Sequence, residues 1–214
     1  MEGVPRETVE QFVDATHRLA AYGVVQCSSG NMSWRVGDDL MAVTGTGAWL
    51  ERIEETQIAL CRISDGATVN GARPSVESGF HAGVLRERPD IGVVLHCQSP
   101  CATAIACSRP DEINLAVIPE VPFYIGEPAI VPLLQPGSAE LAAAVIEAAR
   151  EHELLLLRNH GQVVLGRDFD DALQRAGFFE LACEVLLRGR DLQPLPAEFA
   201  AALRAWMASG TRRA

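Results

Sequence analysis

The sequence predicts a single α/β domain, because short apolar segments rich in β-branched residues alternate with longer amphipathic ones. A length of 214 residues and a hydrophobic fraction of 48% suffice for one sizeable core. No repeat or low-complexity linker divides the chain, and the proline-rich stretch 192–196 only sets off a terminal helix. We therefore expect one domain over residues 1–190 and a helical extension over residues 191–214 that packs on the same domain.

The first third of the chain predicts one helix and three strands. Residues 8–21 carry apolar side chains at helical spacing and stop before Gly23, a suitable C-terminal cap. Residues 32–36 and 40–43 have the pattern of a hairpin around a Gly-Asp-Asp turn. Residues 58–63 are apolar and end at an Asp-Gly turn, which indicates another strand.

The middle of the chain continues this alternation. Residues 76–88 have a helical pattern that ends at a Pro-Asp pair, and residues 91–95 form a run typical of a buried strand. Residues 102–107 are expected to form a helix of small residues. Two short apolar runs, 123–125 and 129–133, are expected to be strands around a Gly-Glu-Pro turn.

The last third predicts three helices and two strands. Residues 138–151 have strong helix propensity after a Pro-Gly-Ser start. Residues 153–157 and 162–165 are apolar strands that turn around Asn-His-Gly. Residues 170–188 form a long amphipathic pattern, and residues 197–207 a last short helix.

Composition excludes some classes of partner. The net charge is −10, so the chain lacks the basic surface that nucleic acids or anionic membranes require. No segment reaches the ~18 consecutive apolar residues of a membrane span, and nothing near the first residue resembles a signal peptide. No Cys-x-x-Cys pair occurs, and we expect a cytoplasmic protein whose cysteines are reduced and mostly in the core. The six are Cys27, Cys61, Cys97, Cys101, Cys107 and Cys183.

One carboxylate and two histidines suggest a metal site with an acid/base group. His96 and His160 each follow a very apolar run, where a buried strand would deliver them to a loop. Glu77 follows Pro-Ser at the start of a predicted helix, and could serve as a base or simply favour the helix dipole with Ser75 as cap. Two imidazoles beside a carboxylate suit a divalent ion.

The neighbours of these residues leave alternatives open. In an extended segment His96 and Gln98 point to the same side and Cys97 points away, but Gln offers only a weak amide ligand. His160, in a turn, can also be purely structural. His81 lies four residues after Glu77 on the same helix face and either reaches the site or is a satisfied, semi-buried histidine.

Two loops, 28–33 and 44–47, are rich in Gly and in Ser, Thr or Asn. Such loops can hold an oxyanion or phosphate through backbone N–H groups and hydroxyls, although most are plain turns.

Taken together and in order, these segments resemble the class II aldolase and adducin-head family, whose sugar-phosphate members include L-fuculose-phosphate aldolase and L-ribulose-phosphate 4-epimerase. The similarity covers about residues 7–190. The motifs that carry it are Ser29-Gly30-Asn31-Met32-Ser33, Val43-Thr44-Gly45-Thr46-Gly47, Pro74-Ser75-Val76-Glu77 with His81, Arg88-Pro89-Asp90, Val94-Leu95-His96-Cys97-Gln98-Ser99-Pro100, Pro136-Gly137-Ser138-Ala139-Glu140-Leu141 and Arg158-Asn159-His160-Gly161.

The resemblance implies a three-layer α/β/α fold around a mostly antiparallel sheet, and a homotetramer with active sites at subunit interfaces. It implies a small-molecule substrate and a divalent metal, commonly Zn²⁺, held at the positions of His96, Gln98 and His160. Glu77 matches the acid/base glutamate of the family. The residues that match its phosphate site are Gly30, Asn31, Thr44, Gly45 and Ser75.

Two departures from the family pattern touch the chemistry. Gln98 stands where the second histidine ligand is expected, so the site could hold Zn²⁺ poorly, hold Mn²⁺, Mg²⁺ or Fe²⁺, or hold no ion. Val76 replaces a serine of the phosphate site, which removes a hydroxyl and adds apolar bulk. A catalytic tyrosine used by some aldolases matches either Tyr124 or its neighbour Phe123.

The expected activity is that of a metal-dependent lyase, which cleaves a small hydroxy-carbonyl compound, such as a sugar phosphate, through an enediolate. Two alternatives stand beside it. One is a decarboxylase or dehydratase of a non-phosphorylated acid on the same fold, and the other is a non-catalytic binding or assembly protein like the adducin head.

Overall fold

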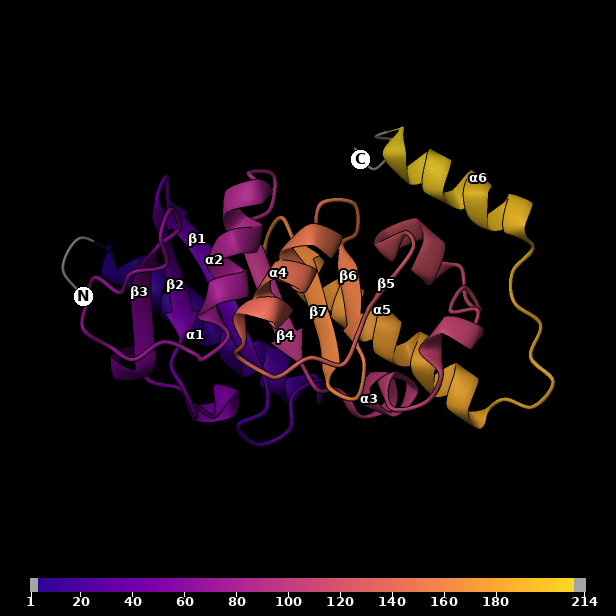
Figure 1. Ribbon diagram of the computed structural model, residues 1–214, viewed down its shortest axis with the longest axis horizontal. Helices are drawn as coiled ribbons and strands as arrows, with labels where there is room; N and C mark the ends of the chain where they lie inside the picture. Colours follow the sequence, from indigo (N-terminus) through magenta and orange to yellow (C-terminus); the bar gives the residue numbers. More distant parts are fainter. Residues whose placement is uncertain (1–3, 210–214) are drawn as a thin grey trace.

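A seven-stranded sheet forms the centre of the computed structural model, which describes residues 4–209 (Figure 1). Its strand order is β3-β2-β1-β4-β7-β6-β5. Neighbouring strands are antiparallel except for the pair β5 and β6, so the expected mostly antiparallel sheet is confirmed. The strands are β1 Asn31–Gly37, β2 Leu40–Thr44, β3 Ile58–Arg62, β4 Val93–Cys97, β5 Ala129–Val131, β6 Leu154–Leu157 and β7 Gly161–Gly166.

Helices cover both faces of the sheet and complete three layers (Figure 1). α2 and α4 pack together on one face, over a core that includes Phe80 and Val94. α3 and α5 pack together on the other face, which α1 also covers, over a core that includes Phe179 and Leu95. Val94 and Leu95 are consecutive, as the alternation of a strand buried on both faces requires. The helices are α1 Arg6–Ala21, α2 Ser78–Glu87, α3 Pro100–Ala106, α4 Ala139–Ala148, α5 Phe169–Arg188 and α6 Ala197–Ala208.

The strand predicted at residues 123–125 is wrong, because this segment belongs to a π-helical turn, Val121–Ile125. Val121 and Ile125 are both buried, so the apolar run reflects burial of a helical turn and not of a strand. The predicted helix 76–88 begins two residues later, at Ser78, with Glu77 as its N-cap. Three short 3₁₀ turns, Leu50–Arg52, Glu55–Gln57 and Pro110–Glu112, were not expected.

The cysteines are all free, but only half of them are core residues. Cys61, Cys97 and Cys183 are buried, whereas Cys27 and Cys107 are exposed and Cys101 is half-buried. The expectation that the cysteines lie mostly in the core is therefore wrong for Cys27, Cys101 and Cys107.

The end of the chain lies against the π-helical turn. The Trp206 ring in α6 lies 5.2 Å from the Phe123 ring, and the Leu195 N–H donates to the Ala116 carbonyl at 2.9 Å. Figure 1 shows α6 at one end of the molecule, beyond the edge of the sheet. Residues 210–214 of the predicted extension lie outside the described residues, and the boundary at residue 190 stays a prediction. None of the described helices is long and apolar enough to cross a membrane.

Candidate active site

Two neighbouring strands bring the first Gly-rich loop against a predicted metal ligand. Asn31, the first residue of β1, lies opposite His96 in the pairing of β1 with β4. Gly30 precedes it with a φ of +107°, and a Cβ at this position would lie 2.9 Å from the His96 carbonyl oxygen. Only glycine fits such a backbone and such a contact. Because Gly30 has no Cβ, this loop can lie in van der Waals contact with β4, the strand that carries His96.

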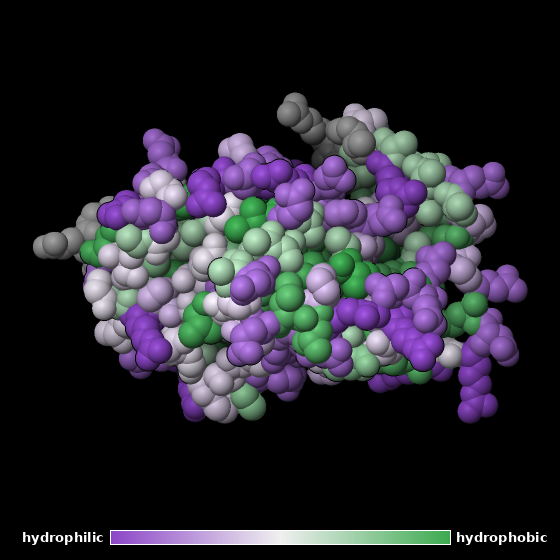
Figure 2. Space-filling view, viewed as in Figure 1, coloured by the Kyte–Doolittle hydropathy of each residue, from purple (hydrophilic) through white to green (hydrophobic). Residues whose placement is uncertain are grey.

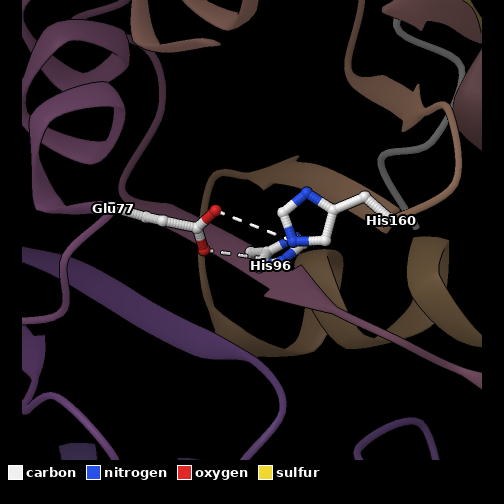
Figure 3. A group of neighbouring side chains, drawn as sticks. All are labelled: Glu77, His96 and His160. Carbon is white, nitrogen blue, oxygen red and sulfur yellow. Dashed lines mark ion pairs between the residues drawn. The ribbon is translucent and has the colours of Figure 1, made fainter. Parts of the chain in front are cut away.

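Glu77, His96 and His160 come together from three separate elements (Figure 3). They belong to the N-terminus of α2, to β4 and to the turn between β6 and β7. Glu77 Oε2 lies 3.5 Å from His96 Nε2, and Glu77 Oε1 lies 3.7 Å from His160 Nε2. Candidate ligand atoms of the three residues all lie within 4.8 Å of one another. These separations are too long for good hydrogen bonds and suit three donors around a common cation.

Each imidazole presents a ring nitrogen to this group. His96 Nδ1 lies 2.9 Å from the Gln162 carbonyl oxygen, which can only accept, so Nδ1 donates this hydrogen bond and Nε2 is the nitrogen that faces Glu77. Burial and the nearby His96 imidazole lower the pKa of His160, while Glu77 acts in the opposite direction. The lowered pKa of His160 favours the neutral imidazole that metal binding needs.

The Glu77 carboxylate is buried and only half satisfied. Asn31 Nδ2 donates to its Oε2 at 2.9 Å. Its Oε1 is buried and has no hydrogen-bond partner among the described residues. A buried, unpaired carboxylate oxygen is costly unless a proton or cation meets it. The donor set thus fits a divalent ion, and the free oxygen also fits proton transfer.

A cavity of about 200 Å³ opens onto these residues. Gln98 is half-buried and lines it together with His96 and His160. Cys97 is buried in the core on the opposite side, as the alternation predicts, and burial raises the pKa of its thiol to about 12. The lining residues are Ser28, Ser29, Gly30, Asn31, Gly45, Thr46, Gly47, Ser75, Val76, Glu77, His96, Gln98, Pro136 and His160.

Thr44 lies behind the cavity and does not line it, and its predicted phosphate contact stays a prediction. Its hydroxyl accepts a hydrogen bond from the Met32 N–H at 3.1 Å, and its carbonyl accepts one from the Ser75 N–H at 3.0 Å. Through these two hydrogen bonds Thr44 links β1 to the segment that carries Ser75. Thr46 lines the cavity instead. Sequence reasoning missed it, although it lies in the same Thr-Gly-Thr-Gly motif.

Two further residues proposed from the sequence also lie outside the cavity. His81 is fully buried, and its Nε2 lies 2.5 Å from Oδ1 of Asn31, which lines the cavity. Tyr124 lies in the π-helical turn, where its ring is 4.7 Å from Phe123 and 4.8 Å from Phe178. Gln162 was not predicted. It orients the His96 ring through its backbone carbonyl, which lies on the neighbouring strand, and a backbone group gives no signal in the sequence.

Known proteins share this fold, and some are about 30% identical to this chain in sequence. The family model of the class II aldolase and adducin N-terminal domain matches residues 10–187. A 3-oxo-tetronate 4-phosphate decarboxylase of Haemophilus influenzae is 32% identical over 147 residues, which are 67% of this chain and 70% of the relative. An L-fuculose phosphate aldolase of Methanocaldococcus jannaschii is 30% identical over 178 residues, or 83% of this chain and 94% of the relative.

A solved structure agrees with the fold over almost the whole chain. YgbL from Klebsiella pneumoniae superposes with a TM-score of 0.85 at 26% identity, and the match covers 94% of this chain and 99% of that one. The family model, the two relatives and the shared fold lead to one conclusion. The chain belongs to the class II aldolase and adducin family.

Proposed function

We propose that this protein is a divalent-metal-dependent lyase that cleaves a small hydroxy-carbonyl compound through an enediolate. The observation that carries the proposal is the buried group of Glu77, His96 and His160 beside a small cavity lined by hydrogen-bond donors. Enzymes of the family, among them the relatives named above, supply the reaction class. The volume of about 200 Å³ suits a small substrate.

His96 and His160 would hold the ion through their Nε2 atoms, and Gln98 would add an amide oxygen or leave a coordination position open. Zn²⁺ is the expected ion, and an oxygen ligand in place of an imidazole widens the choice to Mn²⁺, Mg²⁺ or Fe²⁺. When bound, such an ion supplies a Lewis acid that polarises the carbonyl and hydroxyl oxygens of the substrate.

The walls of the cavity would bind the polar end of the substrate with neutral donors. The hydroxyls of Ser29, Thr46 and Ser75 line it together with the Gly-rich backbone. None of the described lining residues is an arginine, and the sequence contains no lysine. An anionic group would therefore be held by hydrogen bonds and not by an ion pair. Val76 lies at the rim with 61% of its surface exposed and offers no hydroxyl, which favours a carboxylate or a weakly held phosphate.

Glu77 would move the proton at the carbon beside the carbonyl. Its Oε1 is the oxygen without a hydrogen bond, whereas Asn31 holds Oε2. In the cleavage direction the breaking C–C bond leaves its electron pair on the hydroxy-carbonyl fragment, and Glu77 delivers a proton to that carbon. In the reverse direction Glu77 removes this proton.

Decarboxylation is the second candidate, and the cavity favours it in one respect. Aldol cleavage needs a second group that takes the proton of the departing aldehyde's hydroxyl, whereas decarboxylation needs none. In the cavity of one described chain Glu77 is the only carboxylate, and both histidines would be ligands. A 3-oxo acid would lose its carboxylate as CO₂, the electron pair would pass to the adjacent hydroxy-carbonyl, and Glu77 would relay a proton from solvent to the carbon. The decarboxylase relative is consistent with this reaction.

The first experiment measures metal content by mass spectrometry on tag-free protein purified without chelator, beside a Gln98→His variant. About one divalent ion per wild-type chain is the expected result, because the two imidazoles and the Gln98 amide oxygen remain as donors. An empty wild type with a filled variant would overturn the enzymatic proposal. It would favour the non-catalytic, adducin-like alternative.

The second experiment separates the reactions. Metal-loaded protein is offered a panel of ketose phosphates, 3-oxo acid phosphates and the matching non-phosphorylated acids, and release of aldehyde and of CO₂ is measured in parallel. CO₂ release without aldehyde would assign decarboxylation, and aldehyde release would assign aldol cleavage. A better rate with non-phosphorylated acids would support the effect assigned to Val76. No product from any compound would refute the lyase proposal.

The proposal includes a homotetramer with active sites at subunit interfaces. Figure 2 shows hydrophobic residues exposed along α6 and across the middle of one face, among hydrophilic ones. Phe199 and Trp206 in α6 are 48% and 55% exposed. Contact between copies would bury such side chains. Light scattering on purified protein, with a mass of four chains as the expected result, tests this part; a monomer would contradict it.

A further inference from the structure

A row of four buried polar side chains leads from the interior of the protein to the free carboxylate. Ser33 Oγ lies 2.8 Å from His81 Nδ1, His81 Nε2 lies 2.5 Å from Asn31 Oδ1, and Asn31 Nδ2 lies 2.9 Å from Glu77 Oε2. Ser33 and His81 are fully buried, and Asn31 and Glu77 are 7% and 6% exposed. Ser33 and Asn31 come from the same face of β1, and His81 and Glu77 from the start of α2.

The chemistry of the end groups fixes the direction of every bond in this row. A carboxylate only accepts, so Asn31 must turn its amide nitrogen toward Glu77 and its amide oxygen toward His81. His81 Nε2 must then carry the proton that this oxygen accepts. Burial and, to a lesser extent, the nearby His96 imidazole lower the pKa of His81 to about 3, so the ring is neutral at neutral pH. Nδ1 is consequently an acceptor and receives the Ser33 hydroxyl.

By donating to the Asn31 amide oxygen, His81 stabilises the orientation in which the amide nitrogen faces the reacting carboxylate. If the amide were reversed, its oxygen would lie about 3 Å from Glu77 and its nitrogen would meet a ring N–H, so both contacts would be repulsive. A neutral ring with its proton on Nε2 excludes that arrangement. The Phe80 ring, stacked on His81 with centroids 4.6 Å apart, keeps the imidazole in place.

We propose that His81 is a positioning residue, which acts through Asn31 to hold Glu77 Oε2 and leave Oε1 free to exchange a proton with the substrate. Asn31 in this arrangement is a partner of the base, in addition to the phosphate contact implied by its family position. The catalytic consequence rests on the proposed function. The hydrogen-bond direction does not, because it follows from the buried contacts alone.

The direct test of the hydrogen-bond direction needs no substrate. Long-range ¹H–¹⁵N spectra of the full chain at pH 7 distinguish the two neutral tautomers of histidine from the imidazolium, and the sequence contains only five histidines. The signal that disappears in a His81→Gln variant belongs to His81. A neutral ring protonated on Nε2 is the expected result. A ring protonated on Nδ1, or doubly protonated, would overturn the proposal even if the lyase activity were established.

The kinetic test uses three variants. In His81→Leu the ring N–H is lost, and we expect kcat to fall by ~10- to 100-fold while KM changes by less than ~3-fold and metal content stays at the wild-type value. His81→Gln can again donate to Asn31 and should recover most of kcat. His152→Gln, a matched change at a histidine that bonds the Glu127 carbonyl away from the cavity, should keep the wild-type kcat.

The outcomes separate this proposal from the function on which it depends. Equal kcat in His81→Leu and wild type would refute the positioning role while leaving the lyase intact. An equal loss in His81→Leu and His81→Gln would refute the role of a donated hydrogen bond. If His81→Leu does not fold, the glutamine variant and the tautomer measurement decide. If wild type has no turnover, the lyase proposal fails and the tautomer measurement still tests the row of hydrogen bonds.

Discussion

Acidification should destabilise the protein through His81. Burial places the pKa of His81 at about 3 in the folded chain, against an ordinary value of 6.5. Between these values the unfolded chain binds a proton that the folded chain excludes. The contribution of this ring to stability is therefore complete above about pH 6.5 and is lost progressively as the pH falls toward 3.

The size of the effect follows from the same two values. One pKa unit corresponds to about 1.4 kcal/mol, and both titration curves are partly complete at the ends of the range. Between pH 7 and pH 4 we therefore expect the free energy of unfolding to fall by about 3 kcal/mol through His81 alone. For a domain of marginal stability this is a large part of the total.

Urea denaturation at pH 4, 5, 6 and 7 measures this fall for wild type and for His81→Gln. Protein concentration is held constant, and metal is removed by chelation, so that association and ion release do not enter. All other titrating groups are common to the two proteins, and the difference between their pH slopes isolates His81. Equal slopes would refute the conclusion that this ring is buried in its neutral form.

Three more predictions concern the site itself. Gly30→Ala should lower stability by at least about 2 kcal/mol, seen as a lower Tm, because its Cβ would lie 2.9 Å from the His96 carbonyl at a φ of +107°; an unchanged Tm would contradict this contact. Glu77→Gln should lose at least ~100-fold in kcat with its metal retained, and activity near wild type would exclude Glu77 as the base. Val76→Ser should change stability by less than about 0.5 kcal/mol and bind inorganic phosphate more tightly in calorimetry; unchanged affinity would show that Val76 does not limit phosphate binding.

Much of the fold was predictable because the strands are local signals. The apolar segments that form β4, β6 and β7 are bounded by turn residues, and their side chains are stable only when they are buried. The π-helical turn Val121–Ile125 was not predictable, because a short apolar run fits a strand or a buried helical turn equally well. Its neighbour α6, from a distant part of the sequence, contributes to the packing around it.

The site was predictable as a set of residues but not as an arrangement. Motif order indicated Glu77, His96, Gln98 and His160, which all line one cavity. The role of Thr44 behind the cavity depends on contacts with Met32 and Ser75, and these form only once β1 and β2 are paired. Such contacts between distant segments leave no periodic trace in a sequence.

The two departures from the family pattern both fall on cavity-lining residues that are not buried, here called rim residues, and this has an evolutionary consequence. Val76 is largely exposed and Gln98 is half-buried, whereas Asn31, Glu77 and His96 are buried. Replacing a rim residue costs little folding free energy, while a change in the interior leaves a buried group unsatisfied. New ion preferences and new substrates can therefore arise one rim residue at a time, without a stabilising change elsewhere in the molecule.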